Sequence, residues 1–357
     1  MQANTLKPSV ASNPSAKFNS KQRKIDKKNL IDFLKSLFKK KFLMVLFSAG
    51  LLYLLLMDVK FSEIIHSIKT ADLFLLVIAF SLHALGLTIS AYRWRLLLKS
   101  LKVPSKIPYL IKSYLVATFF NHFIPSTVGG DSVRAYDSYK LGNNKSKGLA
   151  VIMVDRFLGL LALLIFVIIS TFLSIEVSSK IPSLSLLIVL ASVGAALFIY
   201  FIFNPPIKFF TIIEKSSIKI VSKFGSILVK IGGAFTQFGN RRKTLSKALA
   251  LSFLLQANVI LYYYLISKAL GFDVHIFNFS LIIPLTIFIT MFPFSVNGIG
   301  IRENALFFFF SFFGIAKSQA IAFAWIEFGM LLTLGVIGGF VYMFRKIEAE
   351  KVKEAIS

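Results

Sequence analysis

The chain has 357 residues, of which 56% are hydrophobic and none is cysteine, and its formal net charge is +25. The lack of cysteine excludes disulfides and cysteine-ligated metals, and the four histidines are scattered, so neither a metal site nor another cofactor is expected. Several apolar runs approach the roughly 20 helical residues that cross a bilayer, which indicates an all-α polytopic membrane protein. In this class basic residues gather in cytoplasmic loops and touch anionic membrane surfaces. Nucleic acid is not expected as a partner, since no nucleic-acid-binding motif is present.

The amino-terminal region, residues 1–41, is predicted to be a basic cytoplasmic tail that is largely disordered. It carries eleven Lys or Arg against Asp26 and Asp32, and up to about Asn29 it has few apolar residues to bury. Residues 42–345 are predicted to form a transmembrane domain, and residues 346–357 a short second cytoplasmic tail.

Six apolar segments are long enough, or nearly so, to be predicted as full membrane spans. They lie at 42–57, 73–91, 149–173, 182–203, 248–268 and 319–344. The connections 92–108 and 204–247 are basic, and the start of the second has the pattern of an amphipathic helix lying on the membrane face. The connections 58–72, 174–181 and 269–276 are short and nearly neutral. Because basic loops stay inside, both termini are predicted to be cytoplasmic.

A seventh apolar segment, 109–125, ends in Pro and Gly rather than in an ordinary loop. If it crossed the membrane fully, the basic segment 134–147 would lie outside, against the charge rule. The conflict disappears if the chain enters from the cytoplasm, breaks between Pro125 and Gly130, and returns. A re-entrant helical hairpin is therefore predicted here.

An eighth apolar segment, 277–297, raises the same problem from the other side. The last span must end inside if its basic end at Arg345 is to be cytoplasmic. This works if the chain enters from outside, breaks between Pro293 and Gly300, and returns through 301–315. The predicted fold therefore has about six full spans plus two re-entrant helical hairpins that enter from opposite faces.

The two breaks resemble each other, which is the pattern of an inverted repeat. They read IPSTVGGDSVR at 124–134 and FPFSVNGIGIR at 292–302, and in each an Arg follows the Pro by nine positions. Pro interrupts the hydrogen bonding of a helix, and Gly permits unusual backbone geometry and the close approach of a ligand. The residues expected to break the helices are Pro125, Gly129, Gly130, Pro293, Gly298 and Gly300.

Charged residues beside the breaks and early in the next span are the predicted substrate-binding residues. They are Asp131, Arg134, Asp155, Arg156, Arg302 and Glu303. A helix that restarts after a break points free N–H groups toward the gap, which favours an anion such as phosphate, and arginine adds bidentate donors. Charges at this depth are costly and imply a function, so the arginines of both breaks are expected to meet in a shared polar chamber. No catalytic residue is predicted.

Each of these residues also has a structural interpretation. Under it, Asp131 and Glu303 are counter-ions of the neighbouring arginines, and Asp131 also caps a helix. Asp155 and Arg156 are then a pair at the membrane surface, and Glu327 in the last span hydrogen-bonds a neighbouring helix.

Other polar residues near these segments are expected to play structural roles. Asn121 and Asn297 flank the breaks and are placed to satisfy backbone groups freed there. Arg93 and Arg95, beside Trp94, are expected to anchor the second span at the membrane interface.

Four segments carry a resemblance to a known family. They are YRWRLLLK (92–99), FFNHFIPSTVGGDSVRAYDSYKLG (119–142), VDRFLGLLAL (154–163) and FPFSVNGIGIREN (292–304). In these segments the chain resembles the flippase-like membrane family that includes the transmembrane region of lysylphosphatidylglycerol synthases. The resemblance extends over most of 42–345. It implies an all-helical bundle with re-entrant helices that translocates lipid, with the six charged residues above lining the lipid path.

In two-domain members of that family this region is thought to flip aminoacylated phosphatidylglycerol made by a fused soluble synthase. This chain stops at Ser357, thirteen residues past the last predicted span, so no synthase domain and no lysine transfer are expected. The lipid partner is left open between a phospholipid and a polyprenyl-phosphate-linked lipid. A separate synthase or glycosyltransferase and a second copy of the chain, in a homo-oligomer, are the other partners considered.

Three functions are compatible with these features. The favoured one is a flippase in the cell (inner or plasma) membrane for an anionic or aminoacylated lipid, or for a lipid-phosphate-linked substrate. One alternative is a membrane-embedded lipid-modifying transferase, or a component of lysylphosphatidylglycerol or glycolipid synthesis. The other is a secondary transporter of a small anion, which two inverted hairpins would also suit.

Overall fold

The computed structural model contains only α-helices as regular structure in the part of the chain that it describes. The described residues are 44–123, 129–142, 144–174, 177, 179–180, 184–203, 206–239, 241–291, 295 and 297–354. The predicted tail 1–41 and the predicted helix breakers Pro125 and Pro293 lie outside the described residues.

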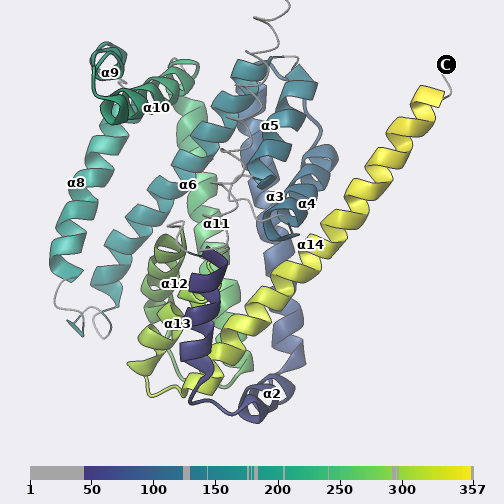
Figure 1. Cartoon of the computed structure of the whole chain (residues 1–357), viewed down its shortest axis with the longest axis vertical. Coiled ribbons are helices and arrows are strands. Elements are labelled where there is room, and N and C mark those ends of the chain that lie inside the picture. Colours follow the sequence, from purple (N-terminus) through teal and green to yellow (C-terminus); the bar gives the residue numbers. More distant parts are fainter. Residues whose placement is uncertain are drawn as a thin grey trace, which may run out of the picture.

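Figure 1 labels the helices in chain order. After a helix over Met44–Leu56 come α2 (Phe61–Lys69), α3 (Leu73–Ser100), α4 (Ile107–Phe123), α5 (Gly129–Gly142), α6 (Lys145–Leu173), α8 (Leu184–Phe203), α9 (Ile207–Glu214), α10 (Lys219–Thr236), α11 (Arg242–Ala269), α12 (Ile276–Thr290), α13 (Ile301–Ser311) and α14 (Lys317–Glu354).

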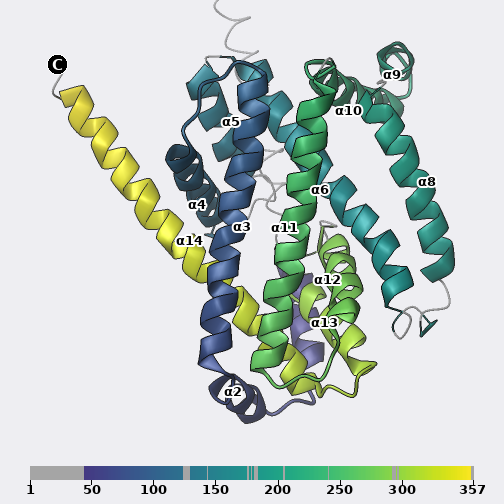
Figure 2. The same cartoon turned by 180° about the vertical axis from the view of Figure 1, so that it is seen from behind.

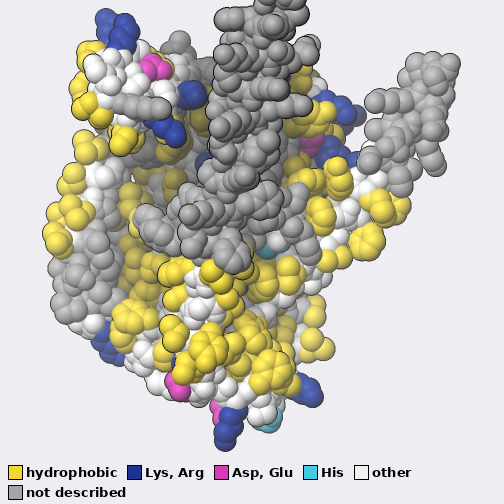
Figure 3. Space-filling view, in the orientation of Figure 1, with side chains coloured by type: hydrophobic (Ala, Val, Ile, Leu, Met, Phe, Trp, Pro, Cys, Tyr) yellow, Lys and Arg dark blue, Asp and Glu magenta, His cyan; other side chains and the backbone are white. Residues whose placement is uncertain are grey.

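Four helices have the length and apolar composition of membrane spans, namely α3, α6, α11 and the Lys317–Arg345 part of α14. The helix over Met44–Leu56 and α2 meet these criteria together, as a pair bent by 85°. In Figure 3 many hydrophobic side chains are visible in the middle and lower part of this face, and Lys and Arg lie toward its top and bottom. The chain is therefore a multi-pass membrane protein, as predicted.

The bundle has two ends, which Figures 1 and 2 show at the bottom and the top. The α2 end, at the bottom, carries α2 and the connections that precede α12 and α14. The α10 end, at the top, carries α5, α9 and α10. In α10 and the turn after it, Phe235 and Phe238 are buried in the core that α6 shares, while Lys223 and Lys230 are exposed. The amphipathic helix predicted at the start of 204–247 is thus two helices, α9 and α10, of which α10 has one buried apolar face and one exposed basic face.

Helices α3 and α11 lie side by side at the centre of the bundle and run antiparallel (Figure 2). The N–H of Asp72, just before α3, donates a 2.9 Å hydrogen bond to the carbonyl of Ala269, at the end of α11. Midway along the pair, Nδ2 of Asn258 donates to the carbonyl of Leu82 at 2.9 Å. A Cβ on Gly86 would lie 3.1 Å from that same Nδ2, so a glycine lets the two helices approach closely there.

Each central helix is followed by a helical hairpin and then by a second long helix. The order is α3, α4–α5, α6 in the first half and α11, α12–α13, α14 in the second. Hairpin α4–α5 lies toward the α10 end and hairpin α12–α13 toward the α2 end (Figures 1 and 2). The halves also exchange contacts, since α4 packs on α14 and α12 packs on α6. This arrangement is the inverted repeat that the two similar breaks predicted.

The first part of the predicted connection 92–108 is helical, because α3 continues to Ser100. The basic residues that suggested a loop after 91 are interleaved with Trp94, Leu97 and Leu98, which are fully buried. Helical spacing of apolar residues therefore continues through the basic segment, and packing on one face keeps it helical.

Two other segments predicted as connections, 58–72 and 134–147, also contain helices. In the first, α2 buries Ile64 against the helix over Met44–Leu56 and α14. In the second, α5 continues to Gly142 and buries Asp137 and Ser138 on the side that faces α4 and α6. The predicted carboxy-terminal tail likewise begins as a continuation of α14.

The close packing of α14 on α4 gives a prediction about stability. A Cβ on Gly338 would lie 1.9 Å from the backbone oxygen of Leu115, a clash that only movement of a helix can relieve. We expect Gly338→Ala to lower the free energy of unfolding by about 1–3 kcal/mol or more, measured by thermal unfolding of the purified protein. Gly329→Ala in the same helix is the control, because nothing lies within 4 Å of its Cβ. Equal unfolding temperatures of the two variants would contradict this close approach.

Candidate functional site

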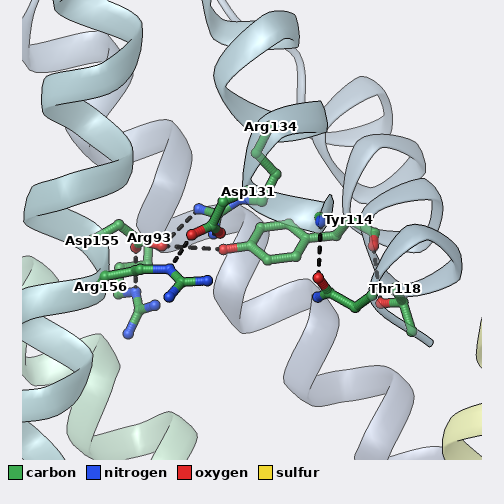
Figure 4. Close-up of polar contacts among 9 residues, drawn as sticks. Arg93, Tyr114, Thr118, Asp131, Arg134, Asp155 and Arg156 are labelled. Atoms are coloured by element: carbon green, nitrogen blue, oxygen red, sulfur yellow. Dashed lines mark hydrogen bonds and ion pairs between the residues drawn. The ribbon is translucent and has the colours of Figure 1, made fainter. Parts of the chain in front are cut away.

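Asp155 on α6 joins two arginines that come from other helices (Figure 4). Its Oδ1 accepts a hydrogen bond from Nε of Arg93 on α3, and its Oδ2 accepts one from a terminal nitrogen of Arg134 on α5, both at 2.6 Å. The hydroxyl of Tyr114 on α4 also donates to Oδ2, at 3.3 Å. The Asp155 side chain is 1% exposed, so one buried carboxylate connects α3, α4, α5 and α6.

Both arginines have further partners that hold them in place. A terminal nitrogen of Arg93 donates to Oγ of Ser252 on α11 at 2.8 Å. The guanidinium carbon of Arg134 lies 4.2 Å from the ring centroid of Tyr114 and 4.8 Å from that of Trp94, within cation–π range. Nε of Arg134 is buried and has no hydrogen-bond acceptor among the described residues. The Nε–H group of Arg134 is therefore a spare donor.

Asp131 and Arg156 extend this group of charges toward the surface. Oδ1 of Asp131 lies 3.6 Å from a terminal nitrogen of Arg134, and its Oδ2 pairs with Nε of Arg156. The Arg156 side chain is 51% exposed, against 16% for Asp131. The structural interpretation that paired Asp155 with Arg156 is therefore wrong, although it is correct that Asp131 is a counter-ion of Arg134. We call Arg93, Asp131, Arg134, Asp155 and Arg156 the Asp155 cluster.

The second hairpin has its own buried charges, which we call the Glu327 cluster (Arg302, Glu303 and Glu327). One terminal nitrogen of Arg302 donates to Glu327 on α14 at 2.8 Å, and the other donates to the adjacent Glu303 at 3.0 Å. All three side chains are less than a tenth exposed. Tyr263 on α11 also hydrogen-bonds Glu327, and the guanidinium of Arg302 lies 5.1 Å from the Phe328 ring centroid. As in Arg134, Nε of Arg302 is buried without an acceptor among the described residues.

Glu303 has a second role at the start of α13. Its Oε2 accepts a 2.6 Å hydrogen bond from the N–H of Gly300, which caps the helix. The sequence predicted that free N–H groups at this helix end would attract a substrate anion. In this conformation the protein's own carboxylate satisfies one of them, so a substrate phosphate would have to replace Glu303 there.

The two clusters occupy matching positions in the inverted repeat. Asp155 and Glu327 each lie ten residues after the first residue of their helix, and each binds the arginine that follows the Pro of its hairpin by nine positions. The two clusters differ in charge. The Asp155 cluster has three arginines and two acids, whereas the Glu327 cluster has one arginine and two acids. The duplicated element is thus a carboxylate of the long helix bound to an arginine of the hairpin.

The two helix breaks contact each other directly. Nδ2 of Asn297 in the second break donates a 2.9 Å hydrogen bond to the carbonyl of Asn121, at the end of α4. Oδ1 of Asn121 in turn accepts a 2.8 Å hydrogen bond from the N–H of Gly130. The two asparagines therefore satisfy backbone groups at the breaks, as predicted.

Glycine is required at the second break for a conformational reason. Gly298 and Gly300 have φ angles of 77° and 84°, in the left-handed region that glycine adopts without strain. A Cβ on Gly300 would in addition lie 2.9 Å from the backbone oxygen of Ser48. At the first break, Gly130 is needed for space, since its Cβ would lie 2.6 Å from both the Ala117 carbonyl oxygen and the side chain of Asn121.

The predicted site residues thus divide between two clusters rather than sharing one set of contacts. Arg134 and Arg302 each pair with acids of their own half, and no described contact joins the two arginines. Arg93, predicted to be an interfacial anchor, is instead a buried member of the Asp155 cluster. The inward direction of Arg93 could have been predicted from the sequence, because the apolar residues Ile89 and Leu97 lie one helical turn before and after it. Both are buried in the structure.

A groove of about 560 Å³ opens between α4, α5 and α14, and we call it the α14 groove. Figures 1 and 2 show α14 leaning away from α4 and α5 toward its carboxy-terminal end, so the groove lies between diverging helices. Residues that define it are Val116, Phe120, Tyr136, Lys140, Tyr342 and Arg345. A second, shallow surface groove of about 380 Å³, lined mostly by apolar residues, lies between α3 and α14 nearer the α2 end.

Among the described residues, no group of three or more His, Cys, Asp or Glu side chains is placed to hold a metal ion.

Comparison with known proteins relates this architecture to a membrane family. The family described as lysylphosphatidylglycerol synthase TM region matches residues 41–339, a range that contains both hairpins and both clusters. A protein described as UPF0104 membrane protein PH1989, from Pyrococcus horikoshii, is 24% identical over 306 residues, which cover 79% of this chain and 90% of that protein.

Proposed function

Because the chain belongs to the family of the lysylphosphatidylglycerol synthase transmembrane region, we propose that it is a flippase for a lipid that carries a phosphate. The proposed substrates are an anionic or aminoacylated phospholipid and a polyprenyl-phosphate-linked lipid. The observation that carries the proposal is the duplicated arginine–carboxylate pair, held by two hairpins that enter the bundle from opposite ends.

Buried charge in the two helical hairpins supports a transport role. A charged side chain at the centre of a bilayer costs about 2.5–3.5 kcal/mol on insertion scales, so such residues persist where they serve a substrate path. Here Arg134 and Arg302 sit in two places related by the inverted repeat, and each keeps one buried N–H without an acceptor among the described residues. We propose that a substrate phosphate binds these donors in turn as it moves from one leaflet to the other.

A difference between the two halves supports an alternating mechanism. In the inverted repeat α6 corresponds to α14 and α11 corresponds to α3. Helices α6 and α11 pack directly together, whereas α14 and α3 are separated by a shallow surface groove of about 380 Å³. Two equivalent interfaces, one closed and one partly open, are expected if the halves exchange conformations by rocking against each other. The described conformation would then be one of the two end states.

We further propose that the α10 end faces the cytoplasm of a cell membrane, because the basic α9 and α10 lie there and basic segments remain inside. Both termini would then be cytoplasmic. An enzyme on that side, such as a separate synthase or glycosyltransferase, would supply the lipid.

A translocation assay with a reversible cross-link tests the function. The rings of Phe120 on α4 and Tyr342 on α14 have centroids 5.2 Å apart across the α14 groove. The chain has no cysteine, so Phe120→Cys/Tyr342→Cys gives one unique pair. In proteoliposomes that contain the unsubstituted protein, we expect a fluorescent anionic phospholipid to move to the outer leaflet, where an external quencher can reach it. We expect a short cleavable bifunctional thiol reagent to stop this exposure in the double variant.

The two single-cysteine variants, treated in the same way, are the controls, and cleavage of the reagent should restore translocation. If translocation continues in the cross-linked double variant, α14 and α4 do not separate during transport. If the natural chain translocates no phosphate-bearing lipid but takes up a soluble anion, it is a transporter of small anions instead.

A further inference from the structure

The α14 groove changes from apolar to polar along its length. Val116 and Phe120 of α4 and Tyr342 of α14 line the part that lies deeper in the bundle. Lys140 near the end of α5, and Arg345 one turn after Tyr342, line the part nearer the α10 end. A membrane lipid has the same order, with acyl chains toward the bilayer centre and its headgroup toward the surface. The polarity of the groove therefore matches a lipid standing upright in the leaflet at the α10 end.

The polar residues of the groove are held in place by hydrogen bonds to one another. Asp137 is 3% exposed, and its two oxygens accept hydrogen bonds of 3.0 to 3.3 Å from Arg345. The Tyr109 hydroxyl donates to Asp137 at 3.0 Å and accepts from Arg345 at 3.1 Å. The guanidinium carbon of Arg345 also lies 4.9 Å from the Tyr109 ring centroid. These contacts fix the direction in which Arg345 presents its guanidinium.

The charge of the polar part favours an anion. Asp137 is buried and balanced by Arg345, while Lys140 is exposed and has no acidic partner among the described residues. The groove therefore has one positive charge in excess. A lysine that adds a point charge beside an oriented arginine is a combination that suits a phosphate diester.

The groove also opens toward the lipid. Beside it on α14, Phe340, Met343 and Phe344 are exposed, as expected of side chains that face acyl chains, and Tyr136 of α5 is exposed at its rim. A lipid could enter sideways from the leaflet without leaving the membrane.

We propose that the α14 groove binds one phosphate-bearing lipid from the leaflet at the α10 end. Lys140 and Arg345 contact the phosphate, Asp137 and Tyr109 position Arg345, and the acyl chains lie along Val116, Phe120 and Tyr342. The site rests on the proposed function, for which it is the place where substrate first binds. It lies outside both charge clusters and adds Lys140 and Arg345 to the binding residues.

A binding experiment on the full chain in detergent tests the site. The probes are phosphatidylglycerol, diacylglycerol, which lacks the phosphate, and soluble glycerophosphoglycerol, which lacks the acyl chains, and the readout is native mass spectrometry. We expect phosphatidylglycerol to bind about tenfold more tightly than diacylglycerol, and glycerophosphoglycerol to bind least. A tenfold change corresponds to about 1.4 kcal/mol. Lys140→Gln should weaken phosphatidylglycerol binding about tenfold and leave diacylglycerol binding unchanged.

Two further variants complete the design. Lys243→Gln replaces an exposed lysine at the start of α11 and should leave all affinities unchanged. Val133→Trp fills the groove without changing its charge and should weaken both lipids. Phosphatidylglycerol affinity that is equal in the natural chain, Lys140→Gln and Val133→Trp would overturn the site. If glycerophosphoglycerol binds as tightly as phosphatidylglycerol, the ligand of the groove is a soluble phosphate compound and not a lipid.

The site and the proposed function can fail separately. Lipid that binds through Lys140 but is not translocated in proteoliposomes would support the site and contradict the flippase. Translocation that continues at the natural rate in Lys140→Gln and Val133→Trp would support the flippase and contradict the site.

Discussion

Asp155→Asn is expected to destabilise the protein more than any substitution of an exposed acid. The substitution keeps the shape of the side chain but removes the charge that neutralises Arg93 and Arg134, each bound at 2.6 Å. It also turns an amide N–H₂ toward one of two arginines that can only donate hydrogen bonds. Breaking a buried ion pair from one side costs about 3–5 kcal/mol, because the remaining charge stays buried without a partner. Here two arginines lose their shared partner.

Thermal unfolding of the purified protein in detergent measures this effect. Asp58→Asn is the matched control, because the Asp58 side chain is 83% exposed and lies 3.8 Å from Lys317, a type of pair worth about 0–1 kcal/mol. We expect the control to unfold at the same temperature as the unsubstituted protein, and Asp155→Asn to unfold at a much lower temperature. If Asp155→Asn were as stable as the control, another anion, such as Asp131 or a bound lipid phosphate, must neutralise the two arginines.

Arg302→Gln is expected to have the second large effect, with a loss of about 3–5 kcal/mol in the free energy of unfolding. Without Arg302, the carboxylates of Glu303 and Glu327 remain buried close to each other with no cation among their described contacts. Arg156→Gln is the matched control, since its side chain is 51% exposed. Thermal unfolding should show a much smaller shift for the control.

A double variant then separates structure from transport. In Arg302→Gln/Glu327→Gln one of the two buried carboxylates is neutral, and the other still caps α13 through Gly300. We expect the double variant to regain most of the stability lost in Arg302→Gln, as residues in one network do not act additively. Translocation should stay lost if Arg302 binds the substrate phosphate. Full recovery of translocation together with stability would mean that Arg302 only holds the fold.

The two hairpins could be predicted because their signals are local in the sequence. Apolar length, loop charge, and Pro and Gly at the breaks each act over a few residues, and together they required 109–125 and 277–297 to turn back. The match between the breaks also indicated the inverted repeat. The helix ends could not be predicted as well, since α3 runs on to Ser100 through a basic segment that only tertiary packing keeps helical.

Partners within the charge clusters were decided by the tertiary structure. Successive residues of a helix point about 100° apart, so the neighbours Asp155 and Arg156 bind different partners, although both contact α5. The same rotation turns Arg93 inward, although it stands between residues that suggest a membrane interface. The sequence by itself determined the class of protein, the opposed hairpins and the arginines at their breaks. Which carboxylate neutralises which arginine depends on how helices far apart in the chain rotate and pack, and only the folded bundle brings those side chains within hydrogen-bonding distance.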